Sequence, residues 1–290
     1  MPFDVITFGS AIVDIFLWVE KIKGEKMEAK KRVIASGGGG TNTAVSFRRL
    51  GLKSAPVARL GGDFFSQIII RELKKEGLSL DFLVRKKEET DSSVILIGPE
   101  GKRTIFVFRG KTRLEIDNIP WKKLQTKWFY IASLEGNLDL AEKLILFAQK
   151  NKIKVAWNPG KRELAEKKRV IKLANSATVF NLNREEMEFL LAKKIREADF
   201  WEKAAGIKSE FKIVTDGRDG AYLLRGKKRH FLPTSKVTPI DETGAGDAFG
   251  SGFVTGLVKG MKPKVAFDLA MHNAASVVQK IGAKKGLLRI

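Results

Sequence analysis

Residues 241–247, Asp-Glu-Thr-Gly-Ala-Gly-Asp, combine a glycine-rich turn with a carboxylate at its end. Gly244, Ala245 and Gly246 let the backbone turn tightly and bring several N–H groups toward one point. A helix is expected to begin directly afterwards, so its unpaired N–H groups and positive dipole end would face the same point. Such a site suits a phosphoryl group in transfer, with Asp247 accepting a proton from a nearby hydroxyl. The same residues also suit an ordinary helix start capped by Asp247, and the segment alone does not decide.

A second glycine-rich segment, Ser-Gly-Gly-Gly-Gly-Thr-Asn-Thr-Ala, occupies residues 36–44 and leads into a predicted helix. Its consecutive glycines offer a surface with little side-chain obstruction, and Asn42 offers both a donor and an acceptor. A polyol lying on this surface would be held by backbone groups and by Asn42. A flexible loop in which Thr41 or Asn42 caps the helix is the alternative, because the segment is neither a Walker A sequence nor a dinucleotide fingerprint.

Short β-rich runs alternate with helical patterns through most of the chain, which predicts βαβ units. Several of the runs are nearly all apolar, as is typical of strands buried on both faces of a parallel sheet. We therefore expect an α/β fold in which helices flank a mostly parallel sheet. Helices are expected over residues 64–76, 138–150 and 263–280, and strands over residues 5–9, 55–60, 128–132, 154–158, 178–181 and 212–215.

Two stretches interrupt this alternation, residues 15–36 and residues 92–110. Both have the pattern of β-hairpins with polar, lysine-rich outer positions, and Gly98-Pro99-Glu100-Gly101 forms the turn of the second. Two such excursions from one α/β core would meet as a small second sheet. That sheet would cover the carboxyl ends of the main strands, where open α/β sheets bind ligands. We expect one domain over residues 1–290, with this sheet inserted as a lid.

The composition excludes several other classes of site. The chain has 290 residues and no cysteine, so disulfides, thiolate metal sites and cysteine nucleophiles are ruled out. Its two histidines, His230 and His272, argue against a multi-histidine metal site or a Ser–His hydrolase. The N-terminus has the pattern of a first strand and lacks a signal-peptide pattern, and nothing approaches the roughly 20 apolar residues of a membrane span. A cytoplasmic protein with no membrane partner is expected.

The charge balance is strongly basic, with 54 basic and 33 acidic residues and a net charge of +21. A nucleic-acid binder would show such a charge, and so would a protein with solvated lysine-rich helix faces that attract an anionic substrate. The basic residues are scattered in short runs, residues 30–32, 167–169 and 227–229, without an interleaved aromatic stacking motif. This distribution disfavours nucleic acid as the partner.

Taken together, these segments resemble the PfkB/ribokinase family of carbohydrate and nucleoside kinases over nearly the whole chain. The ordered segments begin with VITFGSAIVD and SGGGGTNTA, continue through FNLNREEMEFLL and VTDGRDGAYLL, and end with DETGAGDAFGSGF. The Thr-Gly-Ala-Gly-Asp core at residues 243–247 is the most specific of them. The resemblance implies a three-layer ribokinase-like fold with a small β-sheet lid. It also implies transfer of a phosphoryl group from ATP to a hydroxyl of a sugar or a nucleoside.

The resemblance further implies roles for individual residues. Asp247 would be the catalytic base beside an anion hole formed by Gly244, Ala245 and Gly246. The substrate would be contacted by Asp14, at the end of the first strand, and by Gly38, Gly39, Asn42 and Glu135. The nucleotide would be contacted by Asn183, Thr215, Gly217, Gly220 and, on the adenine side, Asn273.

Two cations are implied in the same way. Glu186, in Asn183-x-x-Glu186, would organise Mg²⁺ through water, although this spacing also occurs at ordinary helix starts. Asp241 and Thr243 occupy positions that in several family members help to bind a monovalent cation such as K⁺. Glu242 departs from the family pattern, which usually has a small or β-branched residue there, and its charge leaves the cation preference open.

The sequence leaves three interpretations of the function open. A sugar kinase of the ribokinase or fructokinase type is favoured, and a nucleoside kinase of the adenosine, cytidine or inosine type is the alternative. A nucleoside kinase needs an apolar slot for the base, which aromatic residues of the hairpins would supply unless they form the lid's own core. The aromatic residues concerned are Phe16, Trp18, Phe106 and Phe108. A non-catalytic, nucleic-acid-binding relative is the alternative from another class of function.

The sequence also predicts the oligomeric state. Lid hairpins with exposed apolar residues often pair between subunits, so we expect a homodimer.

Overall fold

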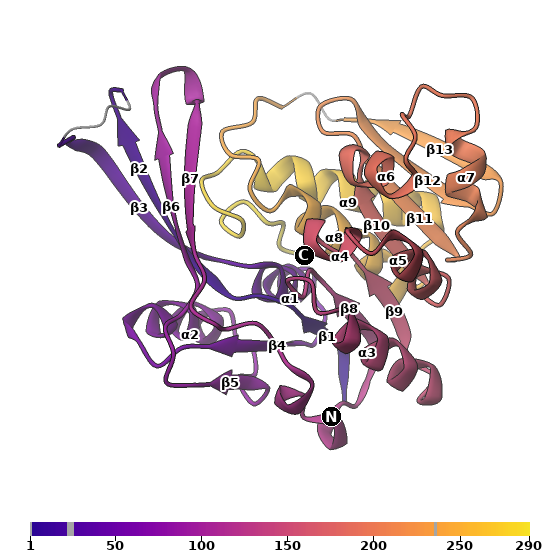
Figure 1. The fold of residues 1–290 in the computed structure, drawn as a ribbon, viewed down its shortest axis with the longest axis horizontal. Helices are drawn as coiled ribbons and strands as arrows, with labels where there is room; N and C mark the ends of the chain where they lie inside the picture. The colour runs from indigo at the N-terminus through magenta and orange to yellow at the C-terminus, as the bar shows by residue number, and fades with distance from the viewer. Residues whose placement is uncertain (1, 22–25, 235–236) are drawn as a thin grey trace.

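The computed structural model describes residues 2–21, 26–234 and 237–290 (Figure 1). Its central sheet contains β1 (Phe3–Phe8), β4 (Ser54–Leu60), β5 (Leu83–Arg85), β8 (Thr126–Ile131), β9 (Lys154–Trp157), β10 (Val179–Asn183), β11 (Phe211–Thr215), β12 (Gly220–Arg225) and β13 (Lys228–Pro233). These strands lie in the order β13-β12-β11-β10-β9-β8-β1-β4-β5. Pairing is parallel from β5 to β11 and antiparallel at the β12 and β13 edge. The predicted α/β class with a mostly parallel sheet is therefore confirmed.

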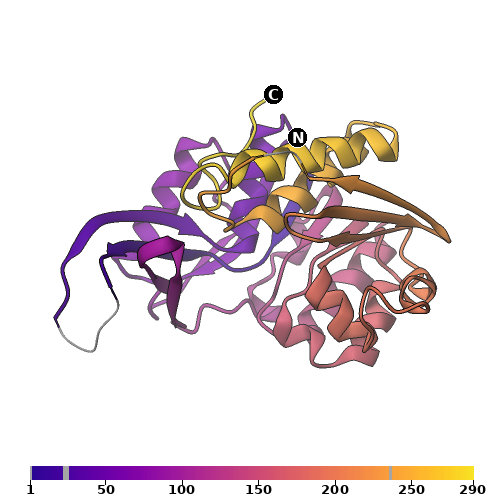
Figure 2. The ribbon, with the colours of Figure 1, turned by 90° about the horizontal axis from the view of Figure 1, so that it is seen from above.

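Helices cover both faces of this sheet and make three layers (Figure 2). One face packs against α1 (Gly39–Arg49), α2 (Phe64–Lys75), α8 (Ala245–Val258) and α9 (Pro263–Val277). The other face packs against α3 (Leu138–Lys150), α5 (Lys167–Ala174), α6 (Arg184–Leu191) and α7 (Phe200–Gly206), with the short α4 (Lys161–Leu164) beside them. No helix in the described ranges is long and apolar enough to cross a membrane.

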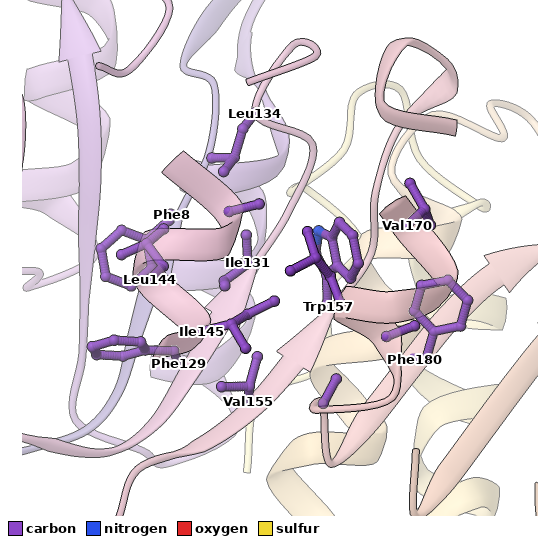
Figure 3. Packing of buried hydrophobic residues seen from close by; sticks show 14 of the residues in the cluster. Phe8, Phe129, Ile131, Leu134, Leu144, Ile145, Val155, Trp157, Val170 and Phe180 are labelled. Carbon is purple, nitrogen blue, oxygen red and sulfur yellow. The ribbon is translucent and has the colours of Figure 1, made fainter. Parts of the chain in front are cut away.

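The helix α3 shows how the sequence places one of these layers. It begins at Leu138 because the side chain of Asn137 accepts the N–H of Leu140 at 3.1 Å. Its apolar stripe, which includes Leu144 and Ile145, is fully buried against Phe129 and its neighbours on the sheet (Figure 3). Burying a side chain of this size contributes about 1.5–3 kcal/mol to folding. The layer therefore follows from the helical spacing of apolar residues.

A second, smaller sheet extends from one side of the three layers (Figures 1 and 2). It contains β2 (Ile12–Val19), β3 (Ala29–Gly37), β6 (Ser92–Ile97) and β7 (Arg103–Phe108), in the order β3-β2-β6-β7. The two hairpins meet through parallel pairing of β2 with β6. Residues 22–25, within the first expected hairpin, lie outside the described residues. The predicted second sheet is thus present, and we call it the lid sheet.

Asp14 lies in the lid sheet, and this corrects our expectation that it ends the first strand. The strand β1 ends at Phe8, and the chain then leaves the main sheet to form β2. The start of α1 packs closely against this point of departure, because a Cβ on Gly9 would lie only 2.8 Å from the backbone nitrogen of Gly40. The carboxylate of Asp14 therefore approaches the site from the lid sheet.

Candidate active site

The carboxyl ends of the parallel strands bring several predicted site residues to one edge of the main sheet. Asn183 ends β10 and Thr215 ends β11, and the two residues are direct neighbours in the strand register. Glu135 follows β8 on the same edge. The glycine segment that opens α1 follows β3 and packs against the end of β1. These are the positions at which a parallel α/β sheet binds ligands.

The turn before α8 has the geometry of an anion site. Gly244 adopts a left-handed conformation with φ of 81°, and a Cβ there would lie 2.5 Å from the Cβ of Ala283. Only glycine fits this position without displacing the neighbouring loop. The first N–H bonded within α8 belongs to Ala248, which donates to the oxygen of Gly244 at 2.8 Å. The N–H groups of Gly246 and Asp247 precede it at the helix start, where an anion is stabilised.

Asp247 lies beside the glycine segment and contacts its asparagine. The Nδ2 of Asn42 donates to Oδ2 of Asp247 at 2.9 Å. A Cβ on Gly39 would lie 3.5 Å from Oδ1 of Asp247, so the glycine segment is directly beside this carboxylate. Gly38 has a φ of 91°, and a side chain there would collide with the oxygen of Ser10. The fold therefore joins the two motifs that the sequence analysis singled out.

The second polar atom of Asn42 is one of several buried polar atoms without a partner among the described residues. Asn42 is 4% exposed, and no donor in the described part of the chain lies within hydrogen-bond reach of its Oδ1. A buried amide oxygen without a donor costs free energy of about 1–3 kcal/mol. A hydroxyl group of a bound molecule would satisfy it.

Lys284 is a buried cation behind the site. No role was predicted for it from the sequence. Its side chain is 2% exposed, and its Nζ donates to the hydroxyls of Ser36 and Thr41. Its Nζ also lies 3.7 Å from Oε2 of Glu72. Burial lowers the pKa of Lys284, while the charges of Glu72, Asp14 and Asp247 oppose that shift. Nothing in the local sequence distinguishes this lysine from the many solvated ones.

Burial and the charge of Lys284 shift the pKa of Asp247 in opposite directions. Burial raises the pKa of Asp247 above its ordinary value, because a charged carboxylate loses solvation. The hydrogen bond from Asn42 and the positive charge of Lys284 lower that pKa again. A carboxyl with a raised pKa accepts a proton more readily, which suits a general base.

Asp14 brings a second carboxylate toward the site from β2. It is 8% exposed, and its Oδ1 accepts a hydrogen bond from the hydroxyl of Ser93, its register neighbour on β6. Burial raises the pKa of Asp14, whereas the Ser93 hydrogen bond and the charge of Lys284 lower it. The lid sheet thus contributes a carboxylate that can accept hydrogen bonds from hydroxyl groups.

Glu135 forms part of a charged cluster between the lid sheet and the main sheet. It has a positive φ of 58°, and its Oε1 lies 3.1 Å from Nη1 of Arg109. The same nitrogen of Arg109 lies 2.8 Å from Oδ2 of Asp91, which is buried. Burial and the charge of Asp91 raise the pKa of Glu135, while Arg109 opposes the shift. Arg109 therefore forms ion pairs with both Asp91 and Glu135.

Asn183 and Glu186 form a capping box at the start of α6. The Oδ1 of Asn183 accepts the N–H of Glu186 at 2.8 Å, and Oε2 of Glu186 accepts the N–H of Asn183 at 2.9 Å. Among the described residues, no cluster of three or more histidine, aspartate or glutamate side chains could hold a metal ion. Mg²⁺ is commonly held by one or two carboxylates together with phosphates and waters. The single carboxylate of Glu186 fits that kind of indirect role.

The turn after β11 lies beside the turn that precedes α8. Gly217 has a φ of 53°, and Gly220 begins β12. Between them, Nη2 of Arg218 lies 3.5 Å from Oε1 of Glu242, and both side chains are exposed. The extra charge of Glu242 is therefore paired with a cation of the neighbouring turn. The two turns are therefore neighbours, and the contact of this region with a nucleotide stays a prediction.

Asn273 lies away from any open surface. It is fully buried, and its Nδ2 donates to Ser46 Oγ at 3.0 Å and to the oxygen of Ala248 at 2.8 Å. Its Oδ1 accepts the N–H of Leu288. Because its hydrogen-bonding groups are used inside the protein, the geometry gives no support to the predicted contact with adenine. Its visible contacts connect α9 with α8 and with the C-terminal segment.

A parallel α/β sheet that places a half-buried aspartate at a helix start suited to an anion is consistent with phosphoryl transfer. The model of the pfkB family of carbohydrate kinases matches residues 3–289. The chain belongs to this family, and it is therefore a kinase that acts on sugars or nucleosides. Membership also implies ATP as the bound nucleotide.

Individual proteins resemble the chain over most of its length. An uncharacterized sugar kinase of Archaeoglobus fulgidus is 28% identical over 253 residues, covering 83% of this chain and 97% of that protein. The ribokinase of Arabidopsis thaliana, solved with ribose and ATP, has a TM-score of 0.86 at 21% identity and covers 100% of this chain and 96% of its own. A nucleoside kinase of Methanocaldococcus jannaschii has a TM-score of 0.82 at 24% identity, covering 99% and 95%. The two structures show the ribokinase fold.

Proposed function

We propose that this protein transfers the γ-phosphoryl group of ATP to a hydroxyl group of a sugar, with Asp247 as the catalytic base. The observation that carries the proposal is the pairing of Asp247 with Asn42 at 2.9 Å beside the glycine segment that opens α1. The unsatisfied Oδ1 of Asn42 then accepts a hydroxyl of the bound sugar. Asp14, facing the site from the lid sheet, accepts a second hydroxyl.

The chemical step takes place at the start of α8, between the carboxylate of Asp247 and the N–H groups of the turn. Asp247 accepts the proton of the acceptor hydroxyl as its oxygen forms a bond to the γ-phosphorus. The bond from that phosphorus to the bridging oxygen breaks, and ADP leaves. The N–H groups at Gly246 and Asp247 stabilise the negative charge on the transferring group. The proton later passes from Asp247 to solvent.

The nucleotide occupies the edge lined by the ends of β10 and β11 in this proposal. Thr215, Gly217 and Gly220 border it on one turn, and Asn183 lies on the neighbouring strand. Mg²⁺, when bound with the nucleotide, would neutralise phosphate charge. Glu186 would contact this ion through water, because one of its oxygens already caps α6.

A sugar is proposed as the acceptor because the described aromatic residues of the lid sheet are packed together or lie away from Asp14. Phe16 is buried with Ile95 and Ile97, and Trp18 packs against them, so these aromatics form the core of the lid sheet. Phe106 stands opposite Val94, whereas Asp14 stands opposite Ser93. Because neighbouring strand positions face opposite sides, Phe106 and Phe108 lie on the face away from Asp14. The aromatic residues that would form a slot for a nucleoside base are therefore packed in the lid core or lie on the face away from Asp14.

The outer face of the lid sheet is proposed to pair with a second copy of the chain. Phe106 and Phe108 are 59% and 49% exposed there, and both are large apolar side chains. Clustered exposed apolar groups, which on β7 also include Ile105 and Val107, are typical of interfaces between protein subunits. The same lid sheet would close over the site and exclude water during transfer.

The test of the acceptor is a screen for ADP release with pentoses, hexoses, their phosphates and nucleosides. A sugar with turnover well above the rate with ATP alone is the expected result. Turnover with nucleosides only would overturn the choice of sugar and favour the alternative kinase. No turnover with any of these acceptors, together with salt-dependent retention on DNA, would favour the non-catalytic nucleic-acid-binding alternative.

A further inference from the structure

Asp241, in the segment that leads to the phosphate turn, is a buried carboxylate with an unusual number of donors. It is 1% exposed, and its Oδ1 accepts the N–H and the hydroxyl of Thr243 at 3.0 and 2.6 Å. Its Oδ2 accepts the N–H of Gly282 at 2.8 Å. The carboxylate therefore connects the turn before α8 with the loop after α9.

A cation from the lid sheet also contacts this carboxylate. Nη1 of Arg103, the first residue of β7, lies 2.8 Å from Oδ1 of Asp241. Nη2 of Arg103 donates to the backbone oxygen of Ile240 at 3.2 Å. The guanidinium thus binds a carboxylate oxygen and the neighbouring carbonyl oxygen together. Burial alone would raise the pKa of Asp241, but the bonds from Thr243 and Gly282 and the charge of Arg103 hold it below its ordinary value.

These oxygens are the ligands that a monovalent cation at Asp241 and Thr243 would need. Alkali ions are bound in proteins by carbonyl and carboxylate oxygens. An ion at the Asp241 carboxylate and the Ile240 carbonyl would compete for the place of the guanidinium of Arg103. The positive charges of the guanidinium and of an added ion would repel each other strongly at one buried carboxylate. The residues around Asp241 do not fit an added K⁺ in this arrangement.

We propose that Arg103 is a built-in cation that replaces a monovalent ion at Asp241 and makes the protein independent of K⁺. Arg103 also links the lid sheet to the phosphate turn, since Thr243 immediately precedes Gly244. A second contact supports this link, because Ile281 packs against the lid core of Phe16, Ile95 and Ile97. The position of the lid sheet is thereby coupled to the start of α8. The kinetic part of this inference rests on the proposed phosphotransfer, and the ion-binding part does not.

Thermal unfolding tests the ion-binding part without any substrate. The wild-type protein is compared in potassium, sodium and choline chloride at a constant ionic strength of about 0.15 M. The melting temperature should be the same in all three salts to within about 1 °C. In Arg103→Gln it should fall in choline and rise by at least about 3 °C with K⁺ or Na⁺, because the freed carboxylate accepts an ion. Lys102→Gln, which removes a neighbouring exposed charge, should behave as the wild type.

The proposal is overturned if K⁺ raises the wild-type melting temperature by several degrees over choline. It is also overturned if Arg103→Gln folds and shows no preference for an alkali ion over choline. Should Arg103→Gln not fold, the wild-type comparison decides, and Arg103→Lys should retain a melting temperature that is insensitive to K⁺. These outcomes do not depend on knowing the acceptor.

The kinetic part of the inference is tested by initial rates with the acceptor that gives the fastest turnover in the screen. Wild-type turnover should change less than about twofold when choline is replaced by K⁺. Arg103→Gln should lose about tenfold or more in turnover and regain part of it with K⁺. Wild-type turnover that requires K⁺ would overturn the proposal. If no acceptor supports turnover, the proposed function fails, whereas the melting temperatures still decide whether Arg103 replaces the ion.

Discussion

The amide nitrogen of Asn42 lies 2.9 Å from Oδ2 of Asp247, although the two residues are 205 positions apart in the chain. This contact holds the carboxylate beside the glycine surface and leaves the other polar atom of Asn42 without a donor among the described residues. One side chain thus contacts the proposed base and, in the proposed reaction, accepts a hydrogen bond from a hydroxyl of the sugar. The contact also lowers the pKa of Asp247 against the effect of burial.

Asp247→Asn should fold normally and lose about a thousandfold or more in turnover. The amide has nearly the shape of the carboxylate but cannot accept the proton of the acceptor hydroxyl. Turnover is measured by coupled ADP release, and folding by thermal unfolding. Asp268→Asn makes the same change at an exposed aspartate of α9 and should retain full activity. Near-normal turnover of Asp247→Asn would remove Asp247 from the role of base.

Asn42→Ala should raise the KM for the acceptor by about tenfold or more and leave the KM for ATP nearly unchanged. The loss follows because a hydrogen bond to a substrate hydroxyl disappears at a buried position. The acid limb of the pH–rate profile should also move to higher pH, since the hydrogen bond that lowers the pKa of Asp247 is absent. Asn151→Ala, at an exposed position after α3, is the control. Equal effects on both KM values would argue for a general loss of structure.

Much of the fold was predictable because its signals are local. The helix over residues 138–150 has the expected bounds, and the turn at Gly244 and the helix after it follow from residue types at adjacent positions. The pairing of Asn42 with Asp247 was not predicted, since no local pattern brings together residues so far apart. Prediction was therefore best for elements and weakest for contacts between them.

The residues that prediction missed are charged side chains whose partners are distant in sequence. Lys284 bonds to Ser36, 248 positions away, and Arg103 bonds to Asp241, 138 positions away. In a chain with 54 basic residues, neither has a neighbouring residue that marks it as buried or paired. Burial of a cation depends on what the folded chain packs around it, which a single sequence does not display.

Phe106→Ser and Phe108→Ser should each weaken self-association if the outer face of the lid sheet pairs between copies. Each change removes a large exposed apolar group from that face, which lowers the apolar area an interface would bury. Sedimentation over a range of protein concentrations measures the monomer fraction, which should rise. Phe189→Ser, which alters an exposed phenylalanine of α6, should leave association unchanged. A wild-type protein that is monomeric at all concentrations would rule out the lid interface.

Lys284→Met should shift the acid limb of kcat/KM to higher pH. Burial places the pKa of Asp247 above its ordinary value, and the positive charge of Lys284 partly lowers it again. The base acts when it is deprotonated, so activity falls as the pH drops through this pKa. Removing the charge raises the pKa, and the loss of activity therefore begins at a higher pH. Far above that pH, where Asp247 is deprotonated in both proteins, the two rates should converge.

The pH dependence separates this electrostatic role from a structural one. Lys285→Met removes the adjacent exposed charge and should leave the acid limb in place, because Lys285 is not among the groups that shift the pKa of Asp247. A folded Lys284→Met protein whose rate falls by the same factor at every pH would show that Lys284 supports only the packing around Ser36 and Thr41. A shifted limb with normal thermal unfolding would instead show that this buried lysine tunes the proposed base.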